Sequence, residues 1–419
     1  MDKIVINGGK PLKGEIKISG SKNATLPLMA AALLAEGKST IRGVPDLRDI
    51  KTMANMLRII GATVTIEDGN MTIDTTGCNY FKAPYELVKT MRASIYVLGP
   101  LVARFGEAEV SLPGGCAWGP RPVDFHIQGI KKLGAEVELE SGYIIARSKK
   151  LKGNIVNFDI PSVGATCNIL MAATLADGKT VIQNSAIEPE VTALAEFLVK
   201  MGAKIKGIGT SELEIIGVDE LFPVDAEVVS DRIEAGTFLV AGAITGGEIT
   251  LHNCEIHHIE SVINKLEETG CKFKISGKSV TLFAPEKVKS VNVKTAVYPG
   301  FPTDMQAQWI ALMSVAEGSC TVTDTIYKDR FTHVSELSRL GANIKLDGNI
   351  AFVKGRENIN GASVMSTDLR ASACLIIAGL KAKGRTDVLR VYHIDRGYEK
   401  IEEKLKALGA DIWREEGGL

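Results

Sequence analysis

The sequence predicts a two-domain α/β protein in which six repeats of about 70 residues form two inside-out α/β barrels, three repeats per domain. The first observation is a step from an amphipathic segment through Gly-Ala or Gly-Cys to a charged strand, recurring every 68 to 73 residues. Its glycines are Gly61, Gly134, Gly202, Gly270, Gly341 and Gly409. The second is a parallel series that ends a more apolar segment, as in "LLAEGKSTI" and "TLADGKTVI". The third is the presence of two kinds of helix in these repeats.

The two kinds of helix differ in where their apolar residues lie. One kind is apolar on nearly every face, as in residues 24–35, 165–176 and 371–380, which is typical of a helix buried on all sides. The other kind, as in residues 189–202 and 397–409, has an apolar stripe and a charged face and ends at glycine, which is typical of a surface helix. Short alternating strands lie between them. Buried helices wrapped by sheets, with solvated helices outside, give the inside-out arrangement.

The domain boundary is expected near residues 223–230, because six repeats are too many for one economical core. The first strand, residues 3–6, precedes the first buried helix. We expect it to pair with the last repeat, which makes the second domain discontinuous.

Composition and charge exclude several function classes. Lys and Arg number 49 against 50 Asp and Glu, so the net charge of −1 provides no basic footprint for nucleic acid or an anionic membrane. The N-terminus has no secretory pattern, and the longest apolar run, residues 26–35, is about half the length of a membrane-spanning helix. The seven cysteines are scattered without a C-x-x-C pair, which suits a reducing compartment. We therefore expect a cytoplasmic protein that binds neither nucleic acid nor membranes.

Polar or charged side chains recur where each buried helix begins and leaves backbone N–H groups free. Three of them are expected to cap their helices, namely Ser162, Asp231 and Asp368. Three others are cations, namely Lys22, Arg92 and Arg370. A cation at this end of a helix is unfavourable by roughly 0.3 to 1 kcal/mol unless an anion is present. Three such cations at equivalent positions predict an anion site.

A second set of cations comes from the loops that join a strand to a surface helix. Equivalent offsets in these loops carry Arg48, Arg121, Arg330 and Arg396, while the third and fourth repeats carry Glu190 and His258. One arginine alone is more often a solvated surface charge. Four in equivalent loops, together with the cations at the helix starts, predict a cationic cleft that the two domains close around a substrate with several negative charges.

Two further side chains are candidates for proton transfer. Asp304, in "FPTDMQAQ", is either a helix N-cap or a general base whose pKa depends on the surrounding cations. Cys116, in "LPGGCAWGPRPVD", has no apolar periodicity to bury it and has Arg121 nearby to favour its thiolate. We expect it to act as a proton donor or a nucleophile.

The stretch "HNCEIHH" gathers four residues that can bind metals, namely His252, Cys254, His257 and His258. Their spacing fits no tight metal-binding motif, and the repeat places them on an ordinary strand-to-helix loop. We therefore predict no metal site and no cofactor.

The longest motifs resemble those of the enolpyruvyl transferases, in particular the members that use UDP-N-acetylglucosamine for peptidoglycan synthesis. They are "SGSKNATLP", "KTMRAS", "LPGGC" with "RPVD", "PSVGAT", "FPTDMQAQ", "TDLRAS" and "YHIDRGYE", and the resemblance runs from the first strand to the last helix. It implies two inside-out α/β domains, one of residues 21–229 and one of residues 1–20 plus 230–419. It also implies transfer of the enolpyruvyl group of phosphoenolpyruvate to the 3′-hydroxyl of UDP-N-acetylglucosamine, with release of phosphate.

The resemblance also implies roles for individual residues. Cys116 is expected to be the general acid on the enolpyruvyl carbon, to form a covalent adduct with phosphoenolpyruvate, and to be alkylated by fosfomycin, a covalent inhibitor. Asp304 is expected to take the proton of the sugar hydroxyl, and Asp368 to lie near the reacting carbons. The phosphate is assigned to Lys22, Arg121 and Arg396, and the carboxylate to Arg330 and Arg370. The nucleotide-sugar site is assigned to Asn23, Arg92, Arg121, Pro122, Val123, Asp124, Phe125, Ser162, Val163 and Ile326.

Three positions depart from the family pattern. Ile160 stands where several relatives have a lysine near the diphosphate, so we assign it no charge contact. Trp118 and Phe125 replace aliphatic residues often found there, which leaves the loop packing and the uracil contacts unassigned.

Two alternative functions are open at this point. One is enolpyruvyl transfer to shikimate 3-phosphate. The "GGC" loop and "RPVDFH" argue against this alternative. The other is a non-catalytic nucleotide-sugar sensor, against which Cys116, Asp304 and the set of arginines count.

Overall fold

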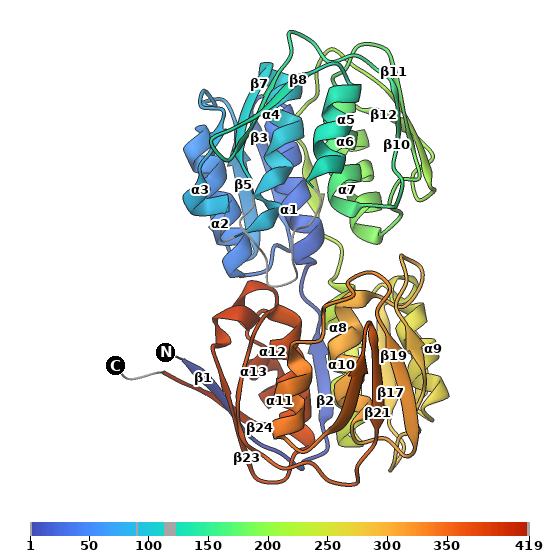
Figure 1. Ribbon diagram of the computed structural model, residues 1–419. Coiled ribbons are helices and arrows are strands. Elements are labelled where there is room, and N and C mark those ends of the chain that lie inside the picture. Colours follow the sequence, from blue (N-terminus) through green and yellow to red (C-terminus); the bar gives the residue numbers. More distant parts are fainter. Residues whose placement is uncertain (1, 89–90, 113–122, 417–419) are drawn as a thin grey trace. The chain divides into compact units, whose positions relative to one another are not determined.

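The computed structural model describes residues 2–88, 91–112 and 123–416, without the side chain of Arg92. The chain divides into two compact units, each described here by itself (Figure 1). The central unit is Gly20–Val229, and the terminal unit combines Met1–Ser19 with Ser230–Leu419. Cys116, Trp118, Arg121 and Pro122 lie outside the described residues.

The central unit contains three four-stranded sheets within its described residues. In each sheet a short strand runs parallel to its neighbour, and two antiparallel strands follow. The first sheet has the order β14 (Asp225–Glu227), β3 (Lys38–Arg42), β5 (Asn70–Asp74), β4 (Thr63–Glu67). The second has the order β6 (Lys82–Ala83), β7 (Glu107–Ser111), β9 (Tyr143–Arg147), β8 (Glu136–Glu140). The third has the order β10 (Ile155–Asn157), β11 (Lys179–Gln183), β13 (Glu212–Ile216), β12 (Lys204–Lys206).

The terminal unit repeats the same pattern of one parallel and two antiparallel pairings. Its first sheet has the order β2 (Lys13–Lys17), β15 (Glu248–His252), β17 (Ser279–Phe283), β16 (Lys272–Ser276). Its second has the order β18 (Val293–Lys294), β19 (Ser319–Thr323), β21 (Ile350–Lys354), β20 (Asn343–Asp347). Its third has the order β22 (Ser363–Met365), β23 (Arg385–Leu389), β1 (Lys3–Asn7), β24 (Asp411–Glu415).

The buried helices of both units begin at the polar residues singled out in the sequence. In the central unit they are α1 (Lys22–Ala31), α4 (Leu98–Phe105) and α6 (Val163–Ala173), with the short helices η1 (Ala32–Leu34) and η2 (Arg92–Val97) continuing or preceding them. In the terminal unit they are α8 (Arg232–Thr245), α10 (Gln306–Met313) after η4 (Thr303–Met305), and α12 (Leu369–Lys381). Every residue from Ala165 to Ala173 and from Arg370 to Leu380 is buried, which confirms that the helices apolar on all faces lie in the core.

The remaining helices carry charged faces and lie outside the buried ones. They are α2 (Arg48–Ile60), α3 (Tyr85–Val88), α5 (Asp124–Lys132) and α7 (Pro189–Lys200) in the central unit, and η3 (Ile256–His258), α9 (Glu260–Glu268), α11 (His333–Arg339), η5 (Val391–Arg396) and α13 (Ile401–Ala407) in the terminal unit. The helix predicted over residues 397–409 begins too early, because α13 starts only at Ile401. Tyr398 precedes α13 and is buried, so it does not belong to a solvated helix face.

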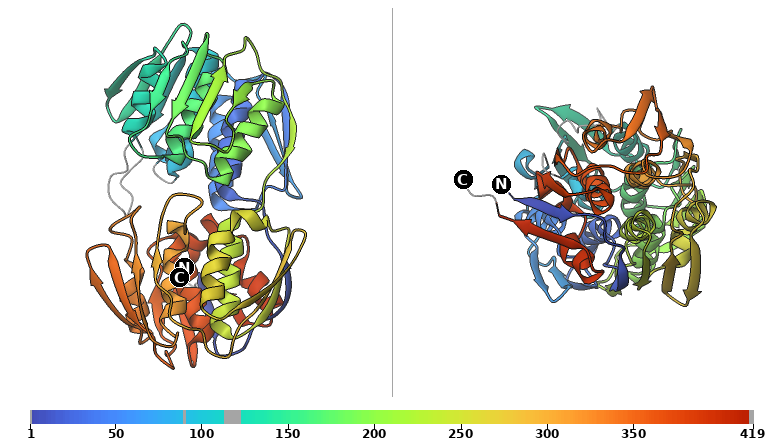
Figure 2. Two further views of the ribbon diagram at one scale, coloured as in Figure 1. Left: turned by 90° about the vertical axis from the view of Figure 1, so that its right-hand side faces the viewer. Right: turned by 90° about the horizontal axis from the view of Figure 1, so that it is seen from below.

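The first strand of the chain pairs with the last repeat, as the sequence predicts. In Figure 2 the blue strand β1 lies beside the red strands at the end of the chain. β1 is antiparallel to both β23 and β24, and Ile4, Val5 and Ile6 are fully buried. The N-terminus thus supplies an interior strand of a sheet whose other strands lie about 360 residues or more further along the chain.

The six repeated glycines all follow surface helices in a left-handed backbone conformation. Their φ values run from 87° to 108°, a region that other L-residues rarely adopt. The repeat in the sequence therefore marks the same helix-ending geometry six times.

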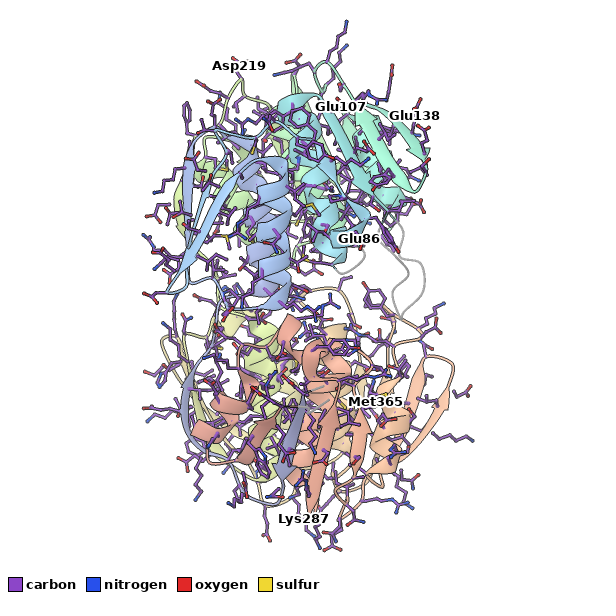
Figure 3. All side chains as sticks on the ribbon, turned by 90° about the vertical axis from the view of Figure 1, so that its left-hand side faces the viewer. Glu86, Glu107, Glu138, Asp219, Lys287 and Met365 are labelled. Atoms are coloured by element: carbon purple, nitrogen blue, oxygen red, sulfur yellow. The ribbon has the colours of Figure 1, made fainter. Side chains whose placement is uncertain are left out.

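Each unit has its own hydrophobic core, and the two cores share no residue. Charged side chains cover the outer surfaces, among them Glu107, Glu138 and Asp219 on the central unit and Lys287 on the terminal unit (Figure 3). Among the described helices, none combines the length and continuous hydropathy needed to cross a bilayer.

Candidate active site

Asp304 lies between two arginines in the terminal unit. Its Oδ1 is 2.8 Å from Nη1 of Arg330, and its Oδ2 is 2.8 Å from Nη2 of Arg370. The two arginine side chains are only 8% and 7% exposed, whereas the Asp304 side chain is 27% exposed. The structure therefore brings together three predicted site residues from η4, from the loop before α11, and from the first turn of α12.

The charges in this cluster do not cancel. Two guanidinium groups face one carboxylate, so the three groups carry a net charge of +1. Burial disfavours the charged form of Asp304, but Arg370 and Arg330 outweigh it and hold the pKa of Asp304 well below its usual value. Asp304 is thus ionised, and its two partners are cations of the kind that bind carboxylate and phosphate groups.

Two neighbours differ in what they add to these three groups. Against the effect of burial, Asp231, the cap of α8, raises the pKa of Arg370 through its negative charge. His333 is buried on α11, and burial, with the charge of Arg330, lowers its pKa to about 3. Its imidazole is therefore neutral at physiological pH.

A second layer of hydrogen bonds holds Arg330. Thr303 Oγ1 accepts from Arg330 Nη1 at 3.1 Å and donates to Asp324 Oδ2 at 2.7 Å. The other Asp324 oxygen accepts from the backbone N–H groups of Ile326 and Tyr327, both at 2.9 Å. Asp324 thereby fixes the loop that carries Ile326 and Arg330. Sequence reasoning missed it, although an aspartate followed by a tight loop is a recognised signal of such a turn.

Lys22 has a carboxylate partner in the central unit. Its Nζ is 3.3 Å from Oδ2 of Asp49, and the two side chains are 12% and 5% exposed. The sequence predicts that a cation at this helix start requires an anion, and Asp49 in the first turn of α2 supplies one. It was not predicted, because the pairing joins two helices through tertiary structure.

The helix-start residues also show which polar groups are caps. Ser162 accepts from the N–H of Ala165, and the carboxylates of Asp231 and Asp368 each accept from two N–H groups of their helices, so these three capping predictions are confirmed. Asp304 makes no such cap. Its carboxylate faces the two arginines, which leaves the general-base interpretation.

The other predicted site residues that the structure describes lie at loop and helix ends. Phe125, in the first turn of α5, packs edge-on against Phe158 with the ring centroids 6.0 Å apart, and α5 packs against α6, which begins at Val163. Ile326 is 37% exposed, and Arg396 ends η5, which packs against α12. The partly or fully exposed members of this set are Asn23, Val123, Asp124, Phe125, Ser162, Val163, Ile326, Asp368 and Arg396.

The "HNCEIHH" stretch is divided among several environments. His252 contacts Glu15 and Ser279, Cys254 is buried, and the rings of His257 and His258 lie against each other with centroids 4.1 Å apart. No group of three or more His, Cys, Asp or Glu side chains suited to a metal ion occurs among the described residues.

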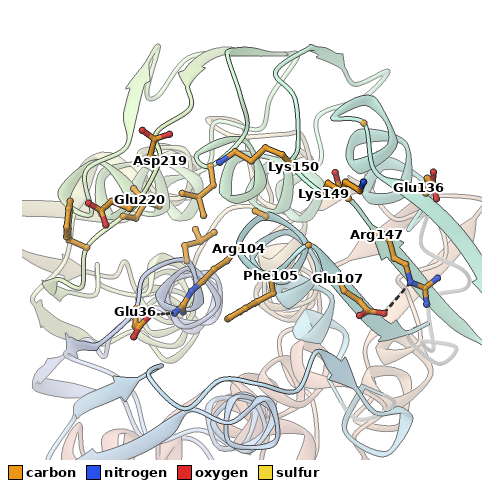
Figure 4. Close-up of a pocket in the computed structure, with 18 residues that line it drawn as sticks. Glu36, Arg104, Phe105, Glu107, Glu136, Arg147, Lys149, Lys150, Asp219 and Glu220 are labelled. Atoms are coloured by element: carbon orange, nitrogen blue, oxygen red, sulfur yellow. Dashed lines mark hydrogen bonds and ion pairs between the residues drawn. The ribbon is translucent and has the colours of Figure 1, made fainter.

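A cavity of about 1260 Å³ opens in the central unit at the end where the buried helices finish (Figure 4). Basic and acidic side chains alternate around it, including Glu36, Arg104, Glu107, Arg147 and Asp219. Arg104 and Arg147 are paired there with Glu36 and Glu107. The predicted site residues that the structure describes do not line this cavity, because they lie at helix starts.

Comparison with known proteins agrees with this geometry. The family model for EPSP synthase (3-phosphoshikimate 1-carboxyvinyltransferase) matches residues 6–405. The chain belongs to this enolpyruvyl transferase family.

Individual members of this family match the chain over nearly its whole length. A protein of Chloroherpeton thalassium named UDP-N-acetylglucosamine 1-carboxyvinyltransferase is 58% identical, covering 99% of this chain and 97% of the relative. A protein of the same name from Trichlorobacter lovleyi is 54% identical, covering 99% of both chains. The crystal structure of the enolpyruvyl transferase NikO from Streptomyces tendae matches with a TM-score of 0.89 at 25% identity, covering 99% of this chain and 98% of that one.

Proposed function

We propose that this transferase moves the enolpyruvyl group of phosphoenolpyruvate to the 3′-hydroxyl of UDP-N-acetylglucosamine and releases phosphate, the first committed step of peptidoglycan synthesis. The observation that carries the proposal is the buried pair of arginines around Asp304, in a chain 58% identical to a relative named for this acceptor. An enolpyruvyl donor has a carboxylate that needs a cationic partner, and its acceptor hydroxyl needs a base. The Asp304 cluster contains both kinds of group.

The reaction is assigned to residues of both units. Cys116 donates a proton to the methylene carbon of phosphoenolpyruvate, which leaves a cation-like centre at the neighbouring carbon. The 3′-oxygen of the sugar bonds to that centre as its proton passes to Asp304. Phosphate then leaves with the bond electrons and takes the proton held by Asp304. A proton of the methyl group returns to the Cys116 thiolate, and the enol double bond is restored. The positive groups stabilise the charge on the departing phosphate.

The substrate contacts are proposed from the motifs shared with the family. Arg330 and Arg370 bind the carboxylate, and Asp368 lies near the reacting carbons. Lys22, Arg121 and Arg396 bind the phosphate. The nucleotide sugar is bound by Asn23, Arg92, Arg121 to Phe125, Ser162, Val163 and Ile326.

The proposal includes the architecture and the compartment. The two units act as the two substrate-binding domains, and each is an inside-out barrel of three repeats. The shared order of one parallel and two antiparallel pairings in six sheets supports this. The cytoplasmic location rests on cysteine usage, since the six described cysteines are free thiols.

Phosphate release tests the acceptor. Phosphoenolpyruvate with UDP-N-acetylglucosamine should release phosphate, and phosphoenolpyruvate with shikimate 3-phosphate should not. Release with only shikimate 3-phosphate would contradict the assignment, and release with neither, despite tight binding of the nucleotide sugar, would indicate a sensor.

Asp304→Ala tests the base. This variant should bind UDP-N-acetylglucosamine with a dissociation constant close to that of the parent, while kcat falls by roughly 100-fold or more. Calorimetry and phosphate release measure the two quantities. An unchanged kcat would remove Asp304 from the proton transfer.

Fosfomycin tests the thiol. Burial raises the pKa of Cys78 to about 11, of Cys254 to about 12 and of Cys320 to about 11, so these thiols are poor nucleophiles. The adduct should therefore map by mass spectrometry to the peptide that contains Cys116, and Cys116→Ser should abolish it. An adduct on another cysteine would overturn the assignment.

A further inference from the structure

The hydroxyl of Tyr398 lies where the three buried helices of the terminal unit begin. The side chain is among the largest fully buried ones, at 1% exposure. Its oxygen is 2.8 Å from Oγ1 of Thr237 on α8, 3.1 Å from Nη1 of Arg370 on α12, and 3.3 Å from Nε2 of Gln308 on α10. One phenol thus contacts a side chain from each helix, and one of these is a proposed substrate-binding arginine.

The direction of each hydrogen bond follows from the number of protons available. Thr237 Oγ1 has one proton, and it donates that proton to the carbonyl of Ile233 at 2.7 Å. Thr237 must therefore accept from the Tyr398 hydroxyl. Arg370 can only donate, so the Tyr398 oxygen accepts from its Nη1. Gln308 Nε2 is a second donor within reach of that oxygen, and it also lies 2.9 Å from the carbonyl of Asp304. The phenol is oriented as an acceptor for Arg370.

Arg370 is held at two points that differ in charge. Nη2 donates to the Asp304 carboxylate at 2.8 Å, and Nη1 donates to the neutral Tyr398 oxygen at 3.1 Å. Against the effect of burial, the carboxylate of Asp231 also raises the pKa of Arg370 through its charge. The phenol fixes the guanidinium without adding a further negative charge to the cluster.

The two anchors also respond differently to proton transfer. When Asp304 accepts a proton, its carboxylate loses its charge and its attraction for Arg370 falls. The hydrogen bond from Arg370 to Tyr398 does not depend on the charge of Asp304. It therefore persists at the moment when the other anchor weakens.

We propose that Tyr398 is a positioning residue that holds the Arg370 guanidinium in its substrate-binding orientation while Asp304 is protonated. This inference rests on the proposed function, because it requires Arg370 to bind the substrate carboxylate and Asp304 to act as the base.

Tyr398→Phe removes the acceptor and keeps the ring. The kcat/KM for phosphoenolpyruvate should fall on the order of 10- to 100-fold, as expected for the loss of a hydrogen bond to a charged group. The dissociation constant of UDP-N-acetylglucosamine should change less than about twofold, because the change is local to Arg370. Thermal melting checks that the variant is folded.

Thr269→Val is the matched control. Thr269 is fully buried in the same unit, donates to the carbonyl of Leu266 at 2.6 Å, and lies outside the Asp304 cluster. It should leave both kinetic quantities near those of the parent. Equal losses in the two variants, or no loss in Tyr398→Phe, would overturn the positioning role.

A double variant tests whether Tyr398 acts through Arg370. In an Arg370→Lys background, Tyr398→Phe should reduce kcat/KM for phosphoenolpyruvate by less than about a further twofold, because the group that it positions is gone. Losses that multiply in full would show that the two residues act independently and would overturn the inference.

A failure of the proposed function can be told apart from a failure of the positioning role, because it shows in the parent enzyme itself. A parent enzyme that releases no phosphate from phosphoenolpyruvate and UDP-N-acetylglucosamine would contradict that function itself. The positioning role is then decided by calorimetry with phosphoenolpyruvate alone, where Tyr398→Phe should still weaken binding on the order of 10-fold. Unchanged binding would overturn it.

Discussion

At the scale of single residues, Asp304 shows how two arginines set the charge of a buried carboxylate. Arg330 and Arg370 stabilise its charged form more than burial opposes it. A carboxylate with such a low pKa is a weak base in solution. Its advantage as the proposed base is that it remains ionised beside two cations.

Removing one arginine should therefore change the pH dependence of the reaction. In Arg330→Met, the pKa of Asp304 should rise, because one stabilising charge and its hydrogen bond are lost. A base is active only above its pKa, so the acid limb of kcat/KM for UDP-N-acetylglucosamine should move to higher pH. The rate measured from pH 4 to 8 checks this shift, beyond any uniform loss of activity.

Arg339→Met serves as the control for Arg330→Met. Arg339 is an exposed arginine of the same unit that pairs with Glu336. It should leave the acid limb where the parent has it. Superimposable limbs for the parent and Arg330→Met would contradict the electrostatic argument.

At the scale of elements, the first turn of α8 contains a buried carboxylate, Glu234, that makes the stability of the fold depend on pH. Glu234 Oε2 accepts from the N–H of Ser19 at 2.7 Å, and Oε1 is 2.5 Å from Nζ of Lys404 on α13. Burial raises the pKa of Glu234 to about 7 from its usual 4.5, although Lys404 opposes the change. The ionised form is thus less favourable in the folded than in the unfolded state.

The sign of the pH dependence follows from these two values. Below about pH 4.5 Glu234 is protonated in both states and its full contribution to stability is present. As the pH rises through about 7 that contribution is lost, because the unfolded chain releases the proton more easily. Glu234→Gln should therefore flatten the fall of Tm between pH 5 and 8. Glu260→Gln, an exposed change in the first turn of α9, should not, and an unaltered slope in Glu234→Gln would refute the linkage.

The sequence predicts the helices and strands of this protein better than the contacts between their side chains. The buried helices, the six glycine stops and the pairing of β1 with the last repeat follow from local periodicity and from the repeat itself. The partners of the charged residues do not. Asp49 and Tyr398 lie in segments whose patterns suggest surface helices, and only tertiary packing brings them to Lys22 and Arg370. A charge at a helix start indicates that a partner exists, but not which residue provides it.

At the scale of the whole molecule, stability is divided between two cores that have no residue in common. Leu170 on α6 belongs to the core of the central unit, and Leu312 on α10 belongs to that of the terminal unit. Both side chains are fully buried. Because burial is the dominant stabilising term, each unit should open according to its own packing.

Leu170→Ala and Leu312→Ala test this separation. Each should cost its own unit about 2 to 5 kcal/mol through lost burial and the cavity left behind. Hydrogen exchange followed by mass spectrometry should show lower amide protection in α6 and its neighbour α4 for Leu170→Ala, and in α10 and its neighbour α12 for Leu312→Ala. The untouched unit acts as the internal control in each case. Equal loss of protection throughout the chain, from either variant, would mean that the two cores unfold as one cooperative structure and that the discontinuous terminal unit has no independent stability.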